Sequence, residues 1–303
     1  MASASRNRMI PPIRHRAANA AALAALLALG AFSPPVARAA GAGSSAPATP
    51  RRAPASYRAP SLRAAAAVVM DARAGRILYT KNERERRPIA SITKLMTALV
   101  YFDSGASLDS SVTLTPEDVA GAGRSLFRRG EVVRARDLLY AALLKSDNVA
   151  ARGLARASGL PGDEYVARMN RRAILLGLDD TRFSEPTGLD PSNVSTALDC
   201  AALIQASARN PFLKEVMTRK EYAFRTSRGV KVAYSTNRLL IRENDESPVG
   251  KTGFIVEAGY CLATCLHTTG RDIAVVVLGA PSSGTRFREA NALLRWALAT
   301  DPR

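Results

Sequence analysis

Cysteine is scarce in this 303-residue sequence, and its three copies argue against a scaffold held together by disulfides. Cys261 and Cys265 lie four positions apart in a predicted strand, about 13 Å from each other on one face. Because that distance is too long for a disulfide, we expect them and Cys200 to be small buried apolar residues. The sequence also lacks a visible internal repeat and a basic stripe interleaved with aromatic residues, and the second absence argues against nucleic-acid binding.

Lysine is also scarce, since seven of the 43 basic residues are lysine and 36 are arginine. Two of the seven, Lys94 and Lys251, fall within short motifs that are described below. An arginine cannot lose its proton inside a protein, whereas a buried lysine can become neutral. A general base made from a basic side chain must therefore be lysine, and this placement indicates acid–base chemistry at the motifs.

Acidic residues are missing from the first 39 positions, which carry five arginines. An apolar run over residues 17–32 is followed by Ala37-Arg38-Ala39, a cleavage site of small residues. This layout predicts a secretory signal peptide over residues 1–39, cleaved at Ala39 or Ala40. No adjacent arginines precede the apolar run, so the general export route is expected. An uncleaved N-terminal anchor is the alternative.

Residues 40–60 are rich in Ala, Pro, Gly, Ser and Arg, which predicts a flexible linker before a single domain over residues 61–303. The formal net charge is +17, and removal of the leader leaves +12 on the mature chain. For an exported protein, the anionic partners are wall polymers and lipid headgroups rather than nucleic acid. A solvated basic surface is the other interpretation.

Apolar periodicity predicts one domain of the α/β (α+β) class. Ile92, Leu95, Met96 and Leu99 fall at helical spacing and indicate a buried helix. Strands before this helix and near the end of the chain, with helices between and after them, favour an antiparallel five-stranded sheet covered by helices, with a helical insert. The predicted strands are 65–72, 76–80, 249–256, 260–267 and 272–278, and the other predicted helices are 137–144, 149–157, 163–176, 197–208 and 286–299.

A serine and a lysine open the predicted buried helix. Ser91 and Lys94 are three positions apart, which makes them neighbours on a helix surface, with about 5–6 Å between their Cβ atoms. Lys94 can therefore reach the Ser91 hydroxyl. The start of a helix also offers unpaired N–H groups and a positive potential, which suit a developing oxyanion. An ordinary N-cap serine is the alternative for Ser91.

A second polar motif, Ser146-Asp147-Asn148, lies at the junction of two predicted helices. The Ser146 hydroxyl could pass a proton, and the Asn148 amide could hold a peptide group of a substrate. Taken by itself, the tripeptide is also an ordinary linker between helices.

A third motif, Lys251-Thr252-Gly253, begins a predicted strand. Gly253 allows the backbone of a ligand to approach closely, while Lys251 supplies positive charge and Thr252 a hydroxyl. Alone this tripeptide is common. The three motifs in this order, however, form the signature of penicillin-binding proteins and class A β-lactamases.

Together the motifs define a catalytic hypothesis. Ser91 is the predicted nucleophile, and neutral Lys94 is the base that activates it. Ser146 is predicted to pass the proton to the leaving amine, and Lys251 is predicted to supply the positive electrostatic field of the site. The N–H groups of Ser91 and Phe254 are predicted to form the oxyanion hole. A base poised near pH 7 requires the Lys94 pKa to fall from about 10.4 to about 7, through burial and the like charge of Lys251.

The sequence resembles the D-alanyl-D-alanine carboxypeptidase/endopeptidase family of low-molecular-weight penicillin-binding proteins, and most closely the penicillin-binding protein seven type of DD-endopeptidase. The similarity runs from about residue 64 to 298 and is carried by SITKLMTALV, TRFSEPTGLDPSNVSTALD, STNRLL and KTGFIVEAGYCL. It implies a β-lactamase/transpeptidase-like fold, peptidoglycan peptides as substrate, β-lactams as covalent inhibitors, and neither a metal nor another cofactor. The middle motif of the family is often Ser-Gly-Asn, from which Asp147 departs.

The resemblance also implies an arginine that reads the carboxylate of the substrate. Arg286 fits this role by its spacing, Arg288 is the fallback, and a residue that caps the last helix is the alternative. The predicted substrate-binding residues are Asn148, Lys251, Thr252, Gly253, Phe254 and Arg286.

The favoured function is a periplasmic D-alanyl-D-alanine endopeptidase that cleaves D-Ala–diaminopimelate cross-links. A carboxypeptidase that trims pentapeptides is the alternative. A β-lactamase would need a carboxylate that activates a water, but no E-x-x-L-N segment is present, and Glu164 is the only acid in a loosely similar region. A non-catalytic peptidoglycan-binding protein is disfavoured because every motif residue is present. Since only residues 300–303 follow the predicted closing helix, we expect no stable membrane anchor. A monomer is also expected.

Overall fold

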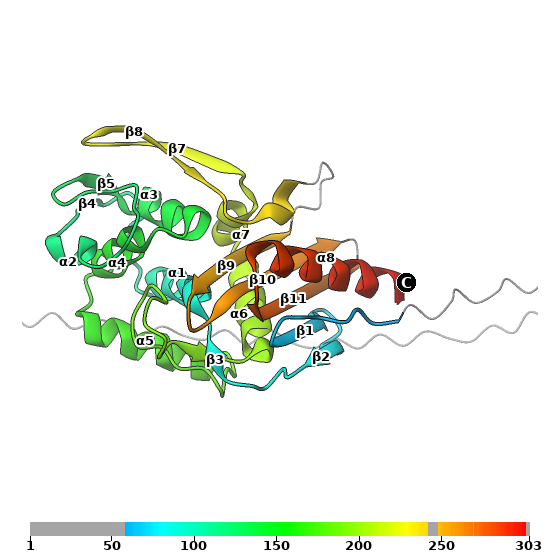
Figure 1. Ribbon diagram of the computed structural model, residues 1–303. Helices are drawn as coiled ribbons and strands as arrows, with labels where there is room; N and C mark the ends of the chain where they lie inside the picture. The colour runs from blue at the N-terminus through cyan, green and yellow to red at the C-terminus, as the bar shows by residue number, and fades with distance from the viewer. Residues whose placement is uncertain (1–57, 242–247, 269, 301–303) are drawn as a thin grey trace, which may run out of the picture. The chain divides into compact units, whose positions relative to one another are not determined.

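The computed structural model describes residues 58–241, 248–268 and 270–300, which contain one five-stranded antiparallel sheet (Figure 1). The strand order is β2-β1-β11-β10-β9, so the first strand of the described chain lies beside the last, and β9 is an edge strand. The predicted fold class and the five-stranded antiparallel sheet are confirmed. The strands are β1 (Ala66–Asp71), β2 (Arg76–Lys81), β9 (Val249–Ile255), β10 (Gly259–Thr268) and β11 (Arg271–Ala280).

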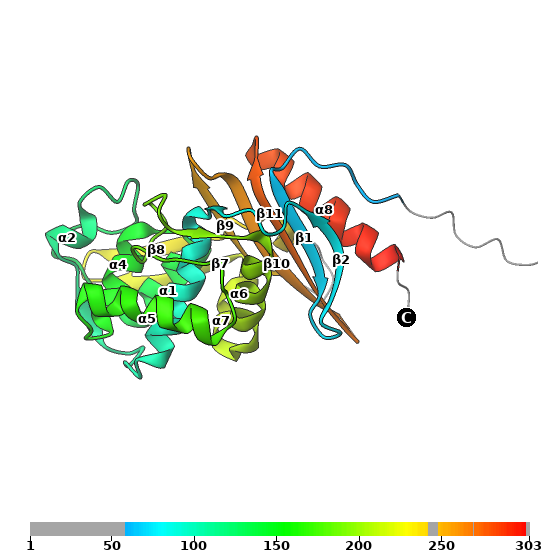
Figure 2. The same cartoon turned by 90° about the horizontal axis from the view of Figure 1, so that it is seen from below.

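Strand β11 is apolar at nearly every position because both of its faces are covered. Val275 and Val277 pack into the apolar cluster beneath α8 (Ser283–Thr300), whereas Val276 belongs to the larger cluster on the opposite face. That opposite face is covered by α6 (Ala197–Arg209). Figure 2 shows the sheet between α8 on one side and α6 on the other.

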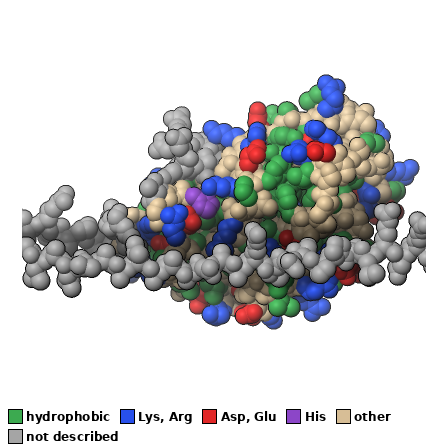
Figure 3. Space-filling view, turned by 180° about the vertical axis from the view of Figure 1, so that it is seen from behind, with side chains coloured by type: hydrophobic (Ala, Val, Ile, Leu, Met, Phe, Trp, Pro, Cys, Tyr) green, Lys and Arg blue, Asp and Glu red, His purple; other side chains and the backbone are tan. Residues whose placement is uncertain are grey.

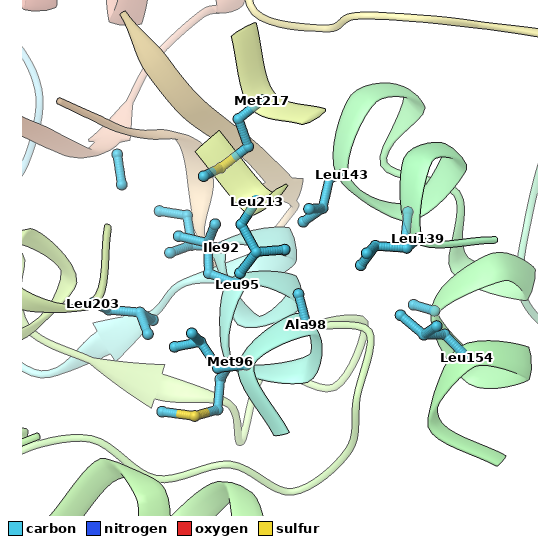
Figure 4. Close-up of a cluster of buried hydrophobic side chains, with 14 of the residues drawn as sticks. Ile92, Leu95, Met96, Ala98, Leu139, Leu143, Leu154, Leu203, Leu213 and Met217 are labelled. Carbon is cyan, nitrogen blue, oxygen red and sulfur yellow. The ribbon is translucent and has the colours of Figure 1, made fainter. Parts of the chain in front are cut away.

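Helix α1 (Thr93–Asp103) lies inside the molecule, and its residues 93–101 are all buried. Its apolar spacing predicted a buried helix, and other helices surround it on several sides. Figure 4 shows Ile92, Leu95 and Met96 among apolar side chains of the surrounding helices. These surrounding side chains are Leu139, Leu143, Leu154, Leu203, Leu213 and Met217.

The insert between the two halves of the sheet is mainly helical, as predicted. It also holds a hairpin, β7 (Glu221–Thr226) and β8 (Gly229–Tyr234), for which no strands were predicted. Strand β7 alternates regularly, but in β8 the apolar Val230 and Tyr234 are exposed while Lys231 is half-buried, so the usual pattern of apolar residues facing inward is lost there. The remaining elements are β3 (Arg87–Pro88), α2 (Pro116–Val119), β4 (Ser111–Thr113), β5 (Val132–Arg134), α3 (Ala135–Tyr140), α4 (Asn148–Ala157), α5 (Gly162–Leu175), β6 (Val194–Ser195), α7 (Pro211–Thr218) and the short helix at Arg238–Ile241.

The predicted helix over residues 137–144 is divided in the structure. Helix α3 ends at Tyr140, and a π-helical turn covers Ala141–Lys145. This turn ends at Ser146, which has a left-handed backbone with φ of 63°. Such π turns often mark functional positions in helices, and here the turn carries the chain into the second polar motif.

The predicted signal peptide and nearly all of the predicted linker lie outside the described residues, and the bounds of the domain stay a prediction. Cys200, Cys261 and Cys265 are buried and free, as expected from their spacing. Within the described ranges no helix is long and apolar enough to cross a membrane. On the described part of the face in Figure 3, Lys and Arg side chains lie scattered among acidic and apolar ones rather than in one continuous stripe.

Candidate active site

Ser91 lies in a 3₁₀ turn, Ala90–Ile92, directly before α1. Two glycines from distant segments touch this turn. A Cβ atom on Gly188 would lie 1.9 Å from the Ala90 carbonyl oxygen, and one on Gly253 would lie 2.8 Å from the Ile89 carbonyl oxygen and 3.2 Å from the Ser91 nitrogen. Only glycine allows backbones to approach this closely, so both residues are needed for the turn to sit between β9 and the segment around residue 188.

Lys94 follows one turn later and is 1% exposed. Its Nζ atom lies 2.8 Å from Ser91 Oγ, 2.7 Å from Asn148 Oδ1 and 2.6 Å from the Thr187 carbonyl oxygen. The last two atoms can only accept hydrogen bonds. A neutral lysine has two N–H groups and one lone pair. If the two N–H groups are donated to Asn148 and Thr187, the lone pair is left for the Ser91 hydroxyl, which can then donate its proton to Nζ.

The surroundings of Lys94 favour its neutral form. Burial lowers the pKa of Lys94 to about 7, against the opposing charges of Glu185 and Asp147, while the positive charge of Arg152 lowers it further. The value agrees with the expectation for a general base. The like charge that contributes comes from Arg152, whereas Lys251 had been expected to supply it.

Lys251, at the start of β9, reaches the second motif. Its Nζ atom donates to Ser146 Oγ over 2.7 Å and to the Thr252 carbonyl oxygen over 2.9 Å. Burial, together with the charges of Lys94 and Arg286, holds the pKa of Lys251 well below its ordinary value. Ser146 is thereby linked to a second buried amine. Its left-handed backbone is a strain of the kind found at functional sites.

Asp147 caps α4 and stabilises the neighbouring loop. Its carboxylate accepts from the Ala150 N–H at 3.0 Å, from the Leu126 N–H at 2.7 Å and from Ser125 Oγ at 2.9 Å. Asn148 donates its Nδ2 to the Ala122 carbonyl oxygen at 2.9 Å, which leaves Oδ1 facing Lys94. A glycine, which the family often has at this position, has no carboxylate to make these bonds. In this chain the Asp147 carboxylate therefore links the second motif to the loop at Ser125 and Leu126.

The remaining predicted residues lie along β9 and beside it. Thr252 Oγ1 is 2.6 Å from Thr236 Oγ1. The Phe254 side chain is 49% exposed and stacks on Tyr260 with ring centroids 4.3 Å apart. Arg286 is 7% exposed, and its Nη1 donates to the carbonyl oxygens of Gly253 at 2.9 Å and Cys261 at 3.2 Å.

Through these bonds the Arg286 guanidinium is held against the backbone of β9 and β10 and is buried there. The fallback residue, Arg288, is exposed and donates to Thr285 Oγ1. Direct contact between Arg286 and a substrate carboxylate stays a prediction.

The segment 185–193 contacts Ser91 and Lys94, and its part in the site was not predicted. Thr187 supplies the carbonyl that Lys94 contacts, and Asn193 supplies the carbonyl that accepts from the Ile89 N–H at 3.1 Å. Glu185 binds the loop together, as described below. The segment was recognised only as part of the resemblance to the family, because single residues such as Glu185 and Thr187 carry no motif of their own.

The arrangement can perform acyl transfer, because a serine hydroxyl lies 2.8 Å from a buried lysine amine and a second amine–hydroxyl pair, Lys251 and Ser146, is also present. Comparisons with known proteins place this chemistry in a family. The profile of peptidase family S11, described as D-alanyl-D-alanine carboxypeptidase, matches residues 53–282. The chain therefore belongs to this family and is a serine DD-peptidase.

Individual relatives are similar over most of their length. The chain is 38% identical over 242 residues to the D-alanyl-D-alanine endopeptidase of Pseudomonas aeruginosa, covering 78% of this chain and 77% of that protein. It is 34% identical over 243 residues to the D-alanyl-D-alanine endopeptidase of Escherichia coli, covering 78% of each.

Solved structures have the same fold. The chain is similar to a D-alanyl-D-alanine carboxypeptidase from Mycobacterium tuberculosis, with a TM-score of 0.75 and 28% identity over 82% of this chain and 96% of that one. It is also similar to the Streptomyces K15 DD-transpeptidase, with a TM-score of 0.74 and 29% identity over 80% and 99% of the two chains. The predicted transpeptidase-like fold and family are thus confirmed.

Proposed function

We propose that this DD-peptidase is an endopeptidase that hydrolyses D-Ala–diaminopimelate cross-links of peptidoglycan through an acyl-enzyme on Ser91. The observation that carries the acyl-enzyme is the position of Lys94 Nζ, 2.8 Å from Ser91 Oγ and 2.6–2.7 Å from two obligate acceptors. The choice of the endopeptidase reaction rests on the relatives with that name, which share 38%, 34% and 32% identity with this chain.

In the proposed reaction, Ser91 Oγ bonds to the D-Ala carbonyl carbon while its proton passes to Lys94 Nζ. The N–H groups of Ser91 and Phe254 receive the developing oxyanion. Collapse of the tetrahedral intermediate breaks the C–N bond, and the proton taken up by Lys94 passes by way of Ser146 to the leaving amine, which makes Lys94 neutral again. Water then attacks the ester carbonyl carbon while Lys94 accepts one of its protons. When the bond from Ser91 Oγ to the acyl carbon breaks, Lys94 returns this proton to Ser91 Oγ.

An extended peptide is proposed to lie along β9, because an edge strand leaves backbone groups available for a further strand. Thr252, Asn148 and Lys251 are its proposed polar contacts. Arg286 is proposed to support binding of the substrate carboxylate. Because it donates two hydrogen bonds to carbonyls of β9 and β10, we propose that it does so indirectly, by holding β9 in place. Labelling by β-lactams, a monomeric state and a periplasmic location belong to the same proposal.

A carboxypeptidase is the second candidate, favoured by the description of the matching family and by relatives named D-alanyl-D-alanine carboxypeptidase at 30–32% identity. A β-lactamase is less well supported, because Glu164 is bound to Arg168 and Arg171 on the surface of α5. Its carboxylate is thus part of an ion-pair network.

The two peptidase reactions are separated by one digestion. The mature protein is incubated with purified cross-linked muropeptide dimers and, in parallel, with monomeric pentapeptides, and the products are resolved by chromatography. We expect dimers to be converted to monomers faster than free D-Ala is released from pentapeptides. Release of D-Ala with the dimers left intact would assign the carboxypeptidase reaction instead.

A further inference from the structure

One carboxylate holds the loop behind the predicted base. Glu185 accepts hydrogen bonds from the backbone N–H groups of Thr187 (2.7 Å), Gly188 and Leu189 (3.0 Å). It also accepts from Thr187 Oγ1 at 2.6 Å and Asn193 Nδ2 at 2.7 Å. An ionised carboxylate offers about four lone-pair sites, so these five donors saturate it. The loop from 185 to 193 is therefore folded around this single negative group.

The same loop contacts the predicted nucleophile and base. The Thr187 carbonyl accepts from Lys94 Nζ, and the Pro186 carbonyl accepts from Thr97 Oγ1 at 2.6 Å on α1. The next residue, Gly188, has φ of +81° and lies so close to the Ala90 carbonyl that no Cβ atom fits. Two consecutive residues bound by Glu185 thus contact Lys94 and the turn of Ser91.

We propose that Glu185 is a positioning residue of the acylation step, whose carboxylate folds the loop so that the Thr187 carbonyl directs the lone pair of Lys94 at Ser91. Lys94 has two acceptors for its N–H groups, Asn148 Oδ1 and the Thr187 carbonyl. If the Thr187 carbonyl moves away, one N–H of the neutral amine has no partner and can turn toward Ser91, and the lone pair then points elsewhere. Glu185 acts through the loop, since both of its carboxylate oxygens are occupied by hydrogen bonds to loop residues.

The charges around Lys94 give this role a measurable signature. Glu185 from the loop and Asp147 before α4 raise the pKa of Lys94, Arg152 of α4 lowers it, and burial is the largest cause of its low value. Lys251 of β9 is the other amine close enough for its own pKa to be lowered by Lys94. Removal of the Glu185 charge therefore moves the Lys94 pKa down, whereas opening of the loop to water would move it up toward 10.5.

The test uses acylation by a fluorescent penicillin, followed across pH. Because this reaction stops at the acyl-enzyme on Ser91 and involves no peptide cross-link, it stays informative even if the proposed endopeptidase activity is absent. Glu185→Gln keeps the shape but places an NH₂ group against N–H donors. We expect acylation to slow by about 10- to 100-fold, the cost of a misplaced catalytic group, and the acid limb of the pH profile to move to lower pH.

Two further variants make the result decisive. Glu185→Asp keeps the charge but is too short to reach all five donors, so it should slow acylation while the acid limb keeps the wild-type midpoint. Glu164→Gln removes a surface carboxylate on α5 that is paired with arginines and should match the wild type. Melting temperatures show whether each variant is folded.

The proposal is overturned if Glu185→Gln acylates like the wild type. It is equally overturned if the rate falls while the acid limb stays in place or moves to higher pH, because the loss would then reflect a general opening of the loop to water rather than a lone pair turned away from Ser91. If Glu185→Gln does not fold, Glu185→Asp decides: an unchanged acylation rate would refute the positioning role, and a slower rate at an unchanged midpoint would support it.

Discussion

Replacement of Lys94 by arginine tests whether the site depends on a neutral amine. The Nζ atom is buried and has three partners within 2.8 Å, two of which only accept. Arginine is a basic side chain of approximately equal length, but its guanidinium stays protonated and offers no lone pair. Lys94→Arg should therefore bind substrate analogues yet fail to take the proton of Ser91.

The magnitude follows from the pKa of Lys94, which burial lowers from 10.5 to about 7. At pH 7.5 a lysine with a pKa near 7 is roughly 75% neutral, whereas one at 10.5 is roughly 0.1% neutral. Burial thus raises the fraction of Lys94 that is neutral, and able to act as a base, by several hundredfold. Loss of a general base costs about 100- to 10,000-fold, so we expect Lys94→Arg to acylate at least about a hundredfold more slowly.

The sign of the pH dependence follows as well. The neutral form is the active one, so acylation should rise as pH rises through about 7 and should be roughly tenfold below its plateau one pH unit lower. The assay is the second-order rate of labelling by a fluorescent penicillin between about pH 5.5 and 9. In Lys94→Arg this rise should be absent.

The matched control is Lys251→Arg, since Lys251 is equally buried but is proposed to act by donating to Ser146 rather than as the base. It should lose less activity than Lys94→Arg. Equal losses in the two variants would refute the division of roles between the amines. A wild-type profile that is flat through pH 7 would refute the assignment of Lys94 as the base.

Two other predictions concern single contacts. Ser91→Ala should abolish covalent labelling without changing the melting temperature by more than a few degrees. Mass spectrometry of the wild type should find one adduct on the Ser91 peptide. Undiminished labelling of the variant would contradict the assignment of Ser91 as the nucleophile. Gly188→Ala should destabilise the fold by several kcal/mol, because its Cβ atom would lie 1.9 Å from the Ala90 carbonyl oxygen. The control Gly159→Ala, with a similar φ of +77° but open space around it, should lower the free energy of unfolding by only about 1–2 kcal/mol. Equal losses of stability in the two variants, measured by urea unfolding, would show that the close contact at Gly188 carries no cost.

The sequence was most informative where a short stretch of chain decides the outcome. Helical spacing from Ile92 onward predicted α1, and continuous apolar runs predicted the strands that now form the sheet. The geometry of a helix places residues i and i+3 together, and Ser91 and Lys94 are indeed joined by a 2.8 Å bond across the 3₁₀ turn and α1.

Local patterns failed where tertiary packing competes with them. The hairpin β7–β8 was missed because β8 exposes the apolar Val230 and Tyr234 and half-buries Lys231, which is the reverse of the expected alternation. The predicted helix over 137–144 ends early in a π turn, and only this irregularity turns Ser146 toward Lys251. Propensity and periodicity carry no signal for such a change of geometry.

By itself, then, the amino-acid order determined the five strands of the main sheet, the buried helix and the identity of the serine, lysine and glycine motifs. Only the tertiary structure decided their partners. Lys251 meets Ser146 across 105 residues of sequence, and Lys94 meets the Thr187 carbonyl across 93. Arg286 came to lie beneath β9 with its bonds on backbone carbonyls. Backbone geometry relates residues a few positions apart, whereas contacts between distant segments depend on how whole layers pack, which no single segment encodes.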